Sequence, residues 1–210
     1  MRHDHPVFSR VYARLCRLEE AGAVGRARAE VAAALSGRVL IVGLGPASDL
    51  RFLPAGVAEV VGIEPSASMR REAEAAVAQA RESGLTVEVI DAVAEDLPLP
   101  DASCDSALLG YVMCSVDDPA RAAAELRRVV RPGGTVGVIE HVAGEPGSWL
   151  CRCQRGISPL WGRFAGGCHP DRDTRAVLAA AGFDVSGLRD ERLVPVPPVS
   201  PALVGTAVAP

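Results

Sequence analysis

Lysine and asparagine are absent from this 210-residue sequence, and all 22 of its basic residues are arginine. The arginines are scattered in runs of no more than two residues, and the formal net charge is −4. Proteins that bind a nucleic-acid backbone normally present a clustered basic surface. We therefore expect no nucleic-acid partner, and a small-molecule substrate instead.

Long apolar runs are missing as well. No stretch approaches the ~18 uninterrupted apolar residues of a membrane-spanning helix, and residues 1–6 contain no apolar leader core. These absences predict a soluble, cytoplasmic protein without a membrane partner. Its six cysteines are then expected to be reduced thiols. Cys151 and Cys153 have no second Cys or His pair at metal-ligand spacing, so we expect no metal site.

The most informative feature that is present is an apolar strand that runs directly into Gly43 and Gly45. Such a turn lets the backbone approach a nucleotide-like ligand closely. Glu64 lies about twenty residues further on, after a second apolar run at 57–63, where a carboxylate can accept hydrogen bonds from both ribose hydroxyls. A dinucleotide site would need a glycine where Ser48 stands. The pattern favours an adenosyl ligand.

Beyond these motifs, strand-like and helix-like patterns alternate with short connections, as in a doubly wound α/β sheet. We expect strands at 38–42, 57–63, 86–90, 106–109, 135–140 and 183–188, and a last, antiparallel strand at 203–208. We expect helices at 7–20, 25–35, 66–83, from 118 to the stop at Pro132, and at 172–181.

Two segments outside the alternating core are expected to border the ligand. The helix at 7–20 is predicted to bury an apolar face formed by Phe8, Val11, Tyr12 and Leu15. Residues 144–170 hold both tryptophans and no clear strand, so we interpret them as an insertion that covers the ligand side of the sheet.

The order of the motifs resembles the class I S-adenosylmethionine-dependent methyltransferases. The segments that carry the resemblance are 39–50, 61–65, 94–98 and 131–134. It implies a Rossmann-like α/β fold with a mostly parallel seven-stranded sheet and helices on both faces, and S-adenosyl-L-methionine as cofactor. It also implies one methyltransferase domain over 1–210, with an N-terminal helical cap (1–37), a cofactor-binding core (38–143), an insertion or lid (144–170), and a C-terminal helix with the last strands (171–210).

A narrower similarity is to the methyltransferase-like group that includes alkyl-thiol S-methyltransferases. It is carried by segments 114–119, 140–142, 167–168 and 181–183 and by Trp149, Gln154, Pro159, Trp161, Arg172 and Thr174. This similarity implies methyl transfer to a small apolar or aromatic molecule at a thiol sulfur. N- or O-methylation in specialised metabolism is the alternative enzyme activity.

Three positions depart from the family pattern. Ile41 stands where an acidic residue is usual, Ala47 where a third glycine is common, and Val93 where an Asp often bonds adenine. Ala47 permits close approach of the ligand if its φ is negative. These departures keep open a catalytically silent S-adenosyl-binding or scaffold protein. A further alternative, arsenic or heavy-metal handling through cysteines, depends on Cys114 and Cys168.

The expected site follows from the carboxyl ends of the strands and from the resemblance. His141 is our first choice for a base, because an unperturbed histidine pKa is about 6.5, and Tyr111 is the second catalytic candidate. Their alternative roles are pocket shaping for His141 and core packing for Tyr111.

Glu64 is expected to be an exposed edge carboxylate. Cofactor contacts are expected at Gly43, Gly45, Ala47, Glu64, Pro65, Met69, Ala94, Glu95 and Gly110, and substrate contacts at Tyr12, Trp149, Trp161, Cys168 and Arg172.

Overall fold

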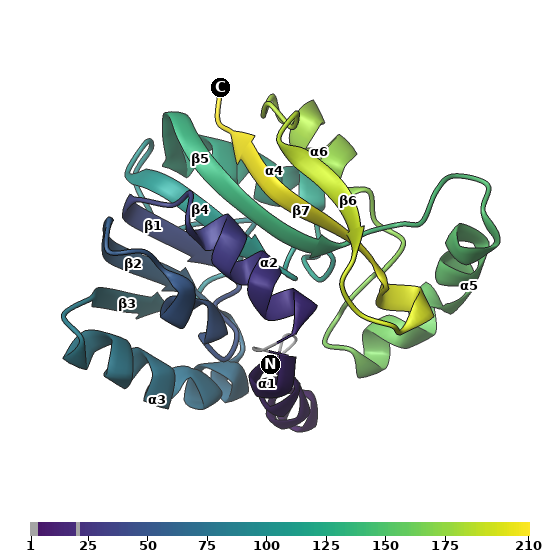
Figure 1. Cartoon of the computed structure of the whole chain (residues 1–210), viewed down its shortest axis with the longest axis horizontal. Coiled ribbons are helices and arrows are strands. Elements are labelled where there is room, and N and C mark those ends of the chain that lie inside the picture. The colour runs from purple at the N-terminus through teal and green to yellow at the C-terminus, as the bar shows by residue number, and fades with distance from the viewer. Residues whose placement is uncertain (1–3, 20–21) are drawn as a thin grey trace.

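The computed structural model describes residues 4–19 and 22–210, which form a seven-stranded sheet in the order β3-β2-β1-β4-β5-β7-β6 (Figure 1). Strands β1 to β5 pair in parallel, and β7 pairs antiparallel with β5 and β6. This topology confirms the predicted Rossmann-like class I fold. The strands are β1 Gly37–Val42, β2 Val57–Ile63, β3 Thr86–Ile90, β4 Cys104–Gly110, β5 Val130–His141, β6 Leu188–Arg192 and β7 Pro201–Val208.

Helices cover both faces of the sheet because the central strands are apolar on both sides. Val39 and Ile41 of β1 pack toward the face of α2 and α3. Leu40 and Val42 pack toward the face of α4 and α6. Helix α1 lies against α3, and α5 stands apart from the sheet at the far right of Figure 1. The helices are α1 Pro6–Glu19, α2 Ala23–Ala32, α3 Ala67–Glu82, α4 Pro119–Val129, α5 Trp149–Phe164 and α6 Thr174–Ala180, with short 3-10 helices η1 Ser48–Phe52 and η2 Pro197–Val199.

Side-chain caps start the helices that follow β2 and β4. Ser66 accepts a hydrogen bond from the Met69 amide at the start of α3, and Asp118 accepts two from the first turn of α4. Such caps satisfy amides that have no partner inside the helix. Both starts agree with the sequence prediction to within one residue.

The strand predicted at 183–188 is wrong. Residues 183–187 form a turn with one bridge between Asp184 and Val208, and β6 begins only at Leu188. Strand β6 is charged (Leu-Arg-Asp-Glu-Arg) because it is an edge strand with residues exposed to solvent. The apolar residues from which a strand was predicted at 183–188 therefore belong mainly to the turn before β6.

The buried face of α1 is also not the predicted one. Ser9, Ala13 and Cys16 are buried, whereas Val11 and Leu15 are about half exposed. The small side chains allow close contact with α3, where the Ser9 and Ser68 hydroxyls are 2.8 Å apart. The predicted helix end at residue 20 lies outside the described residues.

Residues 144–170 contain helix α5, which the sequence analysis did not predict because glycines and Pro159 interrupt its pattern. Ser148 caps its start. The fully buried Gln154 anchors it to the body: its amide nitrogen donates to the carbonyls of Val142 (3.2 Å) and Pro198 (2.9 Å), and its oxygen accepts from the Gly144 amide (2.7 Å). Within residues 4–19 and 22–210, no helix is both long and apolar enough to cross a bilayer.

Candidate functional site

A cavity of about 550 Å³ lies at the carboxyl ends of β1, β2, β4 and β5. Ligands of open α/β sheets bind at this edge, where the strand order reverses between β1 and β4. Its wall is completed by α1, by the segment from Trp161 to Cys168 and by residues 194–199. The volume lies in the range of small-molecule sites.

The turn after β1 is held by backbone contacts. Gly43 and Gly45 have positive φ angles of 66° and 57°, a conformation that glycine adopts without steric penalty. The Leu44 amide donates to the carbonyl of Ile63, at 2.9 Å. A Cβ at Gly43 would lie 2.6 Å from the Val112 side chain, so glycine is required at this position.

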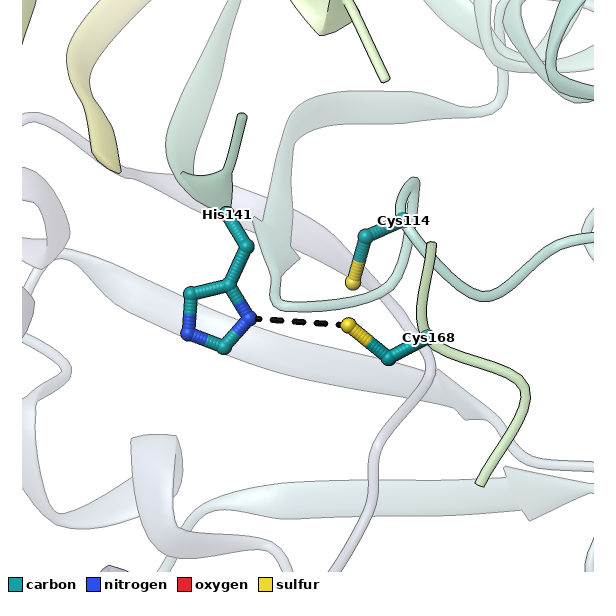
Figure 2. Close-up of side chains that lie close together, drawn as sticks. All are labelled: Cys114, His141 and Cys168. Carbon is teal, nitrogen blue, oxygen red and sulfur yellow. Dashed lines mark hydrogen bonds between the residues drawn. The ribbon is translucent and has the colours of Figure 1, made fainter. Parts of the chain in front are cut away.

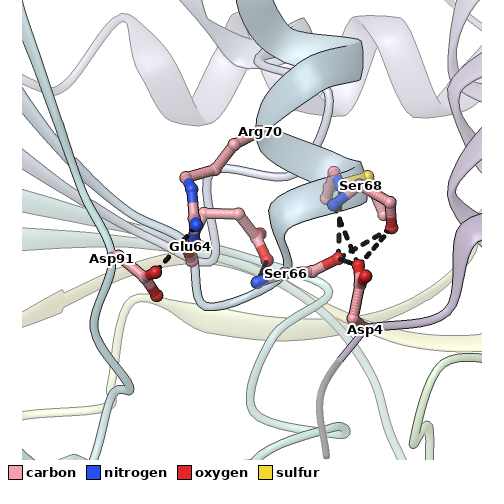
Figure 3. A network of polar contacts seen from close by, with 7 residues as sticks. Asp4, Glu64, Ser66, Ser68, Arg70 and Asp91 are labelled. Atoms are coloured by element: carbon pink, nitrogen blue, oxygen red, sulfur yellow. Dashed lines mark hydrogen bonds and ion pairs between the residues drawn. The ribbon is translucent and has the colours of Figure 1, made fainter. Parts of the chain in front are cut away.

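Glu64 is buried, which corrects the expectation of an exposed carboxylate. Its two oxygens accept from the Gly45 and Ser66 amides, each at 2.9 Å, and the Arg70 guanidinium donates to its backbone carbonyl and pairs with Asp91 (Figure 3). Burial raises the pKa of Glu64 above its ordinary value, against the lowering effect of the two amides.

The polar end of the cavity fits an adenosyl group. Each Glu64 oxygen has a second lone pair and can accept a further hydrogen bond from a ribose hydroxyl. Among the described residues other than its chain neighbours, the atom nearest to a Cβ added at Gly45 is the Gly43 carbonyl oxygen, at 3.8 Å, so the backbone at this glycine faces open space. Pro65, Met69, Ala94, Glu95 and Gly110 also line this cavity.

Ala47 departs from the expectation. It has a positive φ of 59°, is buried, and lies outside the cavity at the start of η1. The negative φ on which its expected cofactor contact depended is therefore not adopted, and the residue does not border the ligand space. Ala47 carries strain that a glycine would not.

Glu95 joins two loops in addition to lining the cavity. Its carboxylate accepts from the amides of Asp117 (2.7 Å) and Asp118 (3.0 Å), just before α4. It is thus a bonded side chain rather than a solvated surface charge. Val93, two residues before Glu95, lines the cavity as well.

The loop after β4 is held by Glu140, which was part of the narrower similarity but had no predicted role. Its carboxylate accepts from the amides of Val112 (2.8 Å), Met113 (2.9 Å) and Cys114 (3.4 Å). Burial raises the pKa of Glu140 to about 7, although the amides oppose this. An acidic residue inside the apolar run of β5 was the available signal for this role.

Tyr111 opens the same loop with a positive φ of 58°, a strained conformation for a bulky residue. Its amide donates to the Ile139 carbonyl at 2.8 Å. Its ring lies 4.3 Å from the His141 ring, measured between centroids. Both expected catalytic side chains therefore meet in the cavity wall.

Cys114 and Cys168 lie beside His141. The Cys168 sulfur is 3.8 Å from His141 Nδ1, and a hydrogen bond with Cys168, together with burial, holds the pKa of Cys114 well above its ordinary value. Cys114 is therefore a neutral thiol in this arrangement.

A buried ion pair forms another part of the wall. Arg28 of α2 pairs with Asp49 of η1, and its guanidinium lies 5.6 Å from the centroid of the Tyr111 ring. Arg28 and Asp49 both line the cavity. Sequence patterns carried no signal for this pair, because the residues belong to different elements and meet only in the folded chain.

Of the five expected substrate contacts, Tyr12, Trp161 and Cys168 line the cavity. The Trp161 indole nitrogen is buried without a hydrogen-bond partner among the described residues. Trp149, in the first turn of α5, lies outside the cavity and is 64% exposed. Arg172 also lies outside the cavity. Its guanidinium donates to the Met113 carbonyl at 2.7 Å and so supports the loop after β4.

Comparison with known proteins identifies methyltransferases, both by a family model and by individual relatives. Residues 40–138 match the family described as methyltransferase domain. The human thiol S-methyltransferase TMT1B is 34% identical over 179 residues, which is 82% of this chain and 72% of that protein. The human thiol S-methyltransferase TMT1A is 31% identical over 145 residues, covering 69% of this chain and 59% of that protein.

Among solved structures, a SAM-dependent methyltransferase from Thermotoga maritima has a TM-score of 0.62 at 21% identity. The alignment covers 97% of this chain and 99% of that one. This likeness supports the fold.

Proposed function

This chain belongs to the class I S-adenosylmethionine-dependent methyltransferases, and we propose that it transfers the methyl group to the sulfur of a small apolar thiol. The cofactor is S-adenosyl-L-methionine. One observation carries the proposal. Glu64, which is suited to hold the adenosyl group, lines the same cavity as His141 and Cys168, which border its other end. The thiol S-methyltransferases named above support sulfur as the acceptor.

The acceptor end is apolar. Phe8 and Tyr12 of α1 stack with their ring centroids 5.3 Å apart, and both line the cavity with Trp161, Val194 and Val196. Apolar lining with a few polar groups is the usual composition of small-molecule sites. The Trp161 N–H has no partner within residues 4–19 and 22–210, and it offers one hydrogen bond to a polar atom of the acceptor.

When bound, the cofactor supplies a methyl group already activated on a sulfonium. The residues of this chain need only orient the acceptor and exclude water, and orientation of this kind contributes on the order of 7–11 kcal/mol. A free thiol has a pKa of about 8.5 and must lose its proton to become a good nucleophile. We assign the ionisation of the acceptor to His141, the imidazole at this end of the cavity.

The test starts with calorimetric titration of the protein with S-adenosylmethionine and S-adenosylhomocysteine. Benzenethiol, aniline and phenol are then compared as acceptors, since they share one ring and differ in the accepting atom. We expect both cofactor forms to bind, and the methylated thiol to form at least about tenfold faster than the other products by mass spectrometry.

The other outcomes identify the alternatives. Faster methylation of aniline or phenol would replace the thiol by an N- or O-acceptor. A folded protein that binds neither cofactor form would favour a silent scaffold. A Trp161→Phe variant should slow thiol methylation, with Trp149→Phe outside the cavity as its matched control.

A further inference from the structure

Two cysteines and one histidine from three separate segments converge at the acceptor end of the cavity. Cys114 follows β4, His141 ends β5, and Cys168 follows α5. Their sulfur and imidazole nitrogen atoms all lie within 4.8 Å of one another. Figure 2 shows the two sulfur atoms next to each other, with the imidazole beside Cys168.

The spacing of these atoms approaches that of a tetrahedral zinc site. Zn–S and Zn–N bonds of about 2.3 and 2.0 Å place neighbouring ligand atoms ~3.5–3.8 Å apart. The distance from Cys168 Sγ to His141 Nδ1 is already 3.8 Å. Catalytic zinc sites use three protein ligands and leave the fourth position to water or substrate. All three side chains line the cavity, so a fourth ligand would come from the acceptor end.

We propose that Cys114, His141 and Cys168 hold a zinc ion whose fourth ligand is the thiolate of the substrate. This inference rests on the proposed function, because the fourth ligand is the methyl acceptor. In this arrangement His141 promotes ionisation of the thiol by binding the zinc ion. It does not itself take the proton. A thiol that coordinates zinc is deprotonated outright.

The reaction balances without a redox step. The S–H bond of the substrate breaks, its proton passes to water at the cavity mouth, and its sulfur binds zinc. A sulfur lone pair then forms the new bond to the methyl carbon, while the bond from that carbon to the sulfonium breaks. The products are a neutral thioether and S-adenosylhomocysteine. The thioether leaves because the thiolate, not the neutral sulfur, is the strong zinc ligand.

Backbone contacts hold the three segments together. The Cys114 carbonyl accepts from the His169 amide at 2.7 Å, which ties the loop after β4 to the segment of Cys168. The Cys114 amide donates to Glu140 at 3.4 Å. Without metal, the Cys114 thiol donates to the Tyr111 carbonyl at 3.6 Å, and zinc would take the place of that proton. Sequence spacing predicted no metal site because neighbouring ligands are 27 residues apart.

The test uses the full chain, kept reduced, stripped with a chelator and titrated with Co²⁺ as a spectroscopic probe. We expect one equivalent to bind, with a thiolate-to-cobalt charge-transfer band and the visible bands of a tetrahedral site, and Zn²⁺ to displace it. Benzenethiol should shift these bands, and phenol should not. These spectra are recorded without S-adenosylmethionine, so they do not depend on turnover.

Single variants identify the ligands. Cys114→Ser and Cys168→Ser should weaken cobalt binding by more than the ~10- to 100-fold that loss of a ligand's hydrogen-bond partner causes. The control is Cys153→Ser, an exposed cysteine of α5 outside the cavity, which should bind cobalt as the wild type does. Circular dichroism confirms that each variant is folded.

Several results would overturn the site. One is the absence of stoichiometric cobalt binding, and another is equal binding by folded Cys114→Ser. A disulfide joining Cys114 and Cys168, found by mass spectrometry in protein that binds no metal, would make them a redox pair instead. Full thiol methylation by metal-free protein would remove the catalytic role and leave the proposed function intact. Cobalt bands that respond to benzenethiol in a protein without methyl transfer would support the site and overturn the proposed function.

Discussion

Arg28 and Asp49 form an ion pair that is buried between α2 and η1 at the wall of the cavity. Removing one partner of a buried pair leaves an uncompensated charge, so we expect Arg28→Met to lower the free energy of unfolding by about 3–5 kcal/mol. The double variant Arg28→Met/Asp49→Leu should recover most of this loss, because both charges are gone. Urea denaturation of the two single variants and the double variant measures the coupling. Additive losses would show that the two side chains act independently.

The carboxylate of Glu64 should link cofactor affinity to pH. Glu64→Gln should weaken S-adenosylmethionine binding about 10- to 100-fold, because hydrogen bonds to a charged acceptor contribute roughly 1.5–3 kcal/mol. The folded-state pKa of Glu64 lies above its ordinary value of 4.5. Wild-type affinity should therefore fall as the pH is lowered through this raised pKa, since the protonated carboxyl accepts fewer hydrogen bonds.

The effect of Glu64 on stability has the opposite sign. Its raised pKa contributes stability that is present at low pH and is lost as the pH rises through the folded-state pKa. Calorimetric titration and denaturation, both followed upward from pH 4.5, the ordinary pKa of this carboxyl, separate the two trends. Glu64→Gln should remove the contribution of this residue to both, and an unchanged pH dependence of affinity would assign that dependence to another group.

Strain at Ala47 can be tested by a glycine substitution. Ala47→Gly should raise the free energy of unfolding by about 0.5–1 kcal/mol, because an alanine with φ of 59° pays a steric penalty that glycine avoids. Cofactor affinity should stay within about twofold, since Ala47 lies outside the cavity. Ala102→Gly, with φ of 49° in an exposed turn, is the matched control for strain alone. Tighter cofactor binding only in Ala47→Gly would place this residue in the binding site after all.

The loop after β4 depends on Glu140. In Glu140→Gln, an amide NH₂ replaces one acceptor oxygen, and at least one buried backbone amide loses its partner, which costs about 1–3 kcal/mol. Hydrogen exchange by NMR should show faster exchange at the Val112 and Met113 amides, which this carboxylate now holds. Glu125→Gln, a more exposed residue on α4, should leave these two amides unchanged.

The parallel core could be predicted from sequence because each strand is a short apolar run followed by a residue that stops it. Gly43 is such a stop after β1, and Gly84 likewise ends helix α3 before β3 begins, so the parallel strands lie along the chain where they were expected. The edge strand β6 and helix α5 escaped prediction for a physical reason. Because β6 is exposed to solvent, its sequence lacks the alternating apolar residues of a buried strand. In α5, Pro159 interrupts the helical spacing of the apolar residues.

Tyr12, Trp161 and Cys168 were expected from segments outside the parallel core, and other site residues were predictable from their place at a strand end. Glu64 and His141 occupy such positions, and both line the cavity. Arg28 came into view only with the tertiary structure, because it pairs across elements. The contact of Cys114 with Cys168 and His141 also became visible only there, because the three come from distant segments. Trp149 lies outside the cavity, contrary to prediction, because the composition of a segment does not determine which way its side chains point.

Different parts of the chain line the two ends of the cavity. The end at Glu64, where we propose that the nucleoside binds, is lined from residues 42–110, at the carboxyl ends of the strands and in the segments that follow them. Much of the end proposed for the acceptor comes from α1, from the segment after α5 and from residues 194–199. Exchanging these peripheral segments between relatives should therefore retarget acceptor choice without rebuilding the nucleoside end, which makes them the natural positions for directed evolution of new substrates.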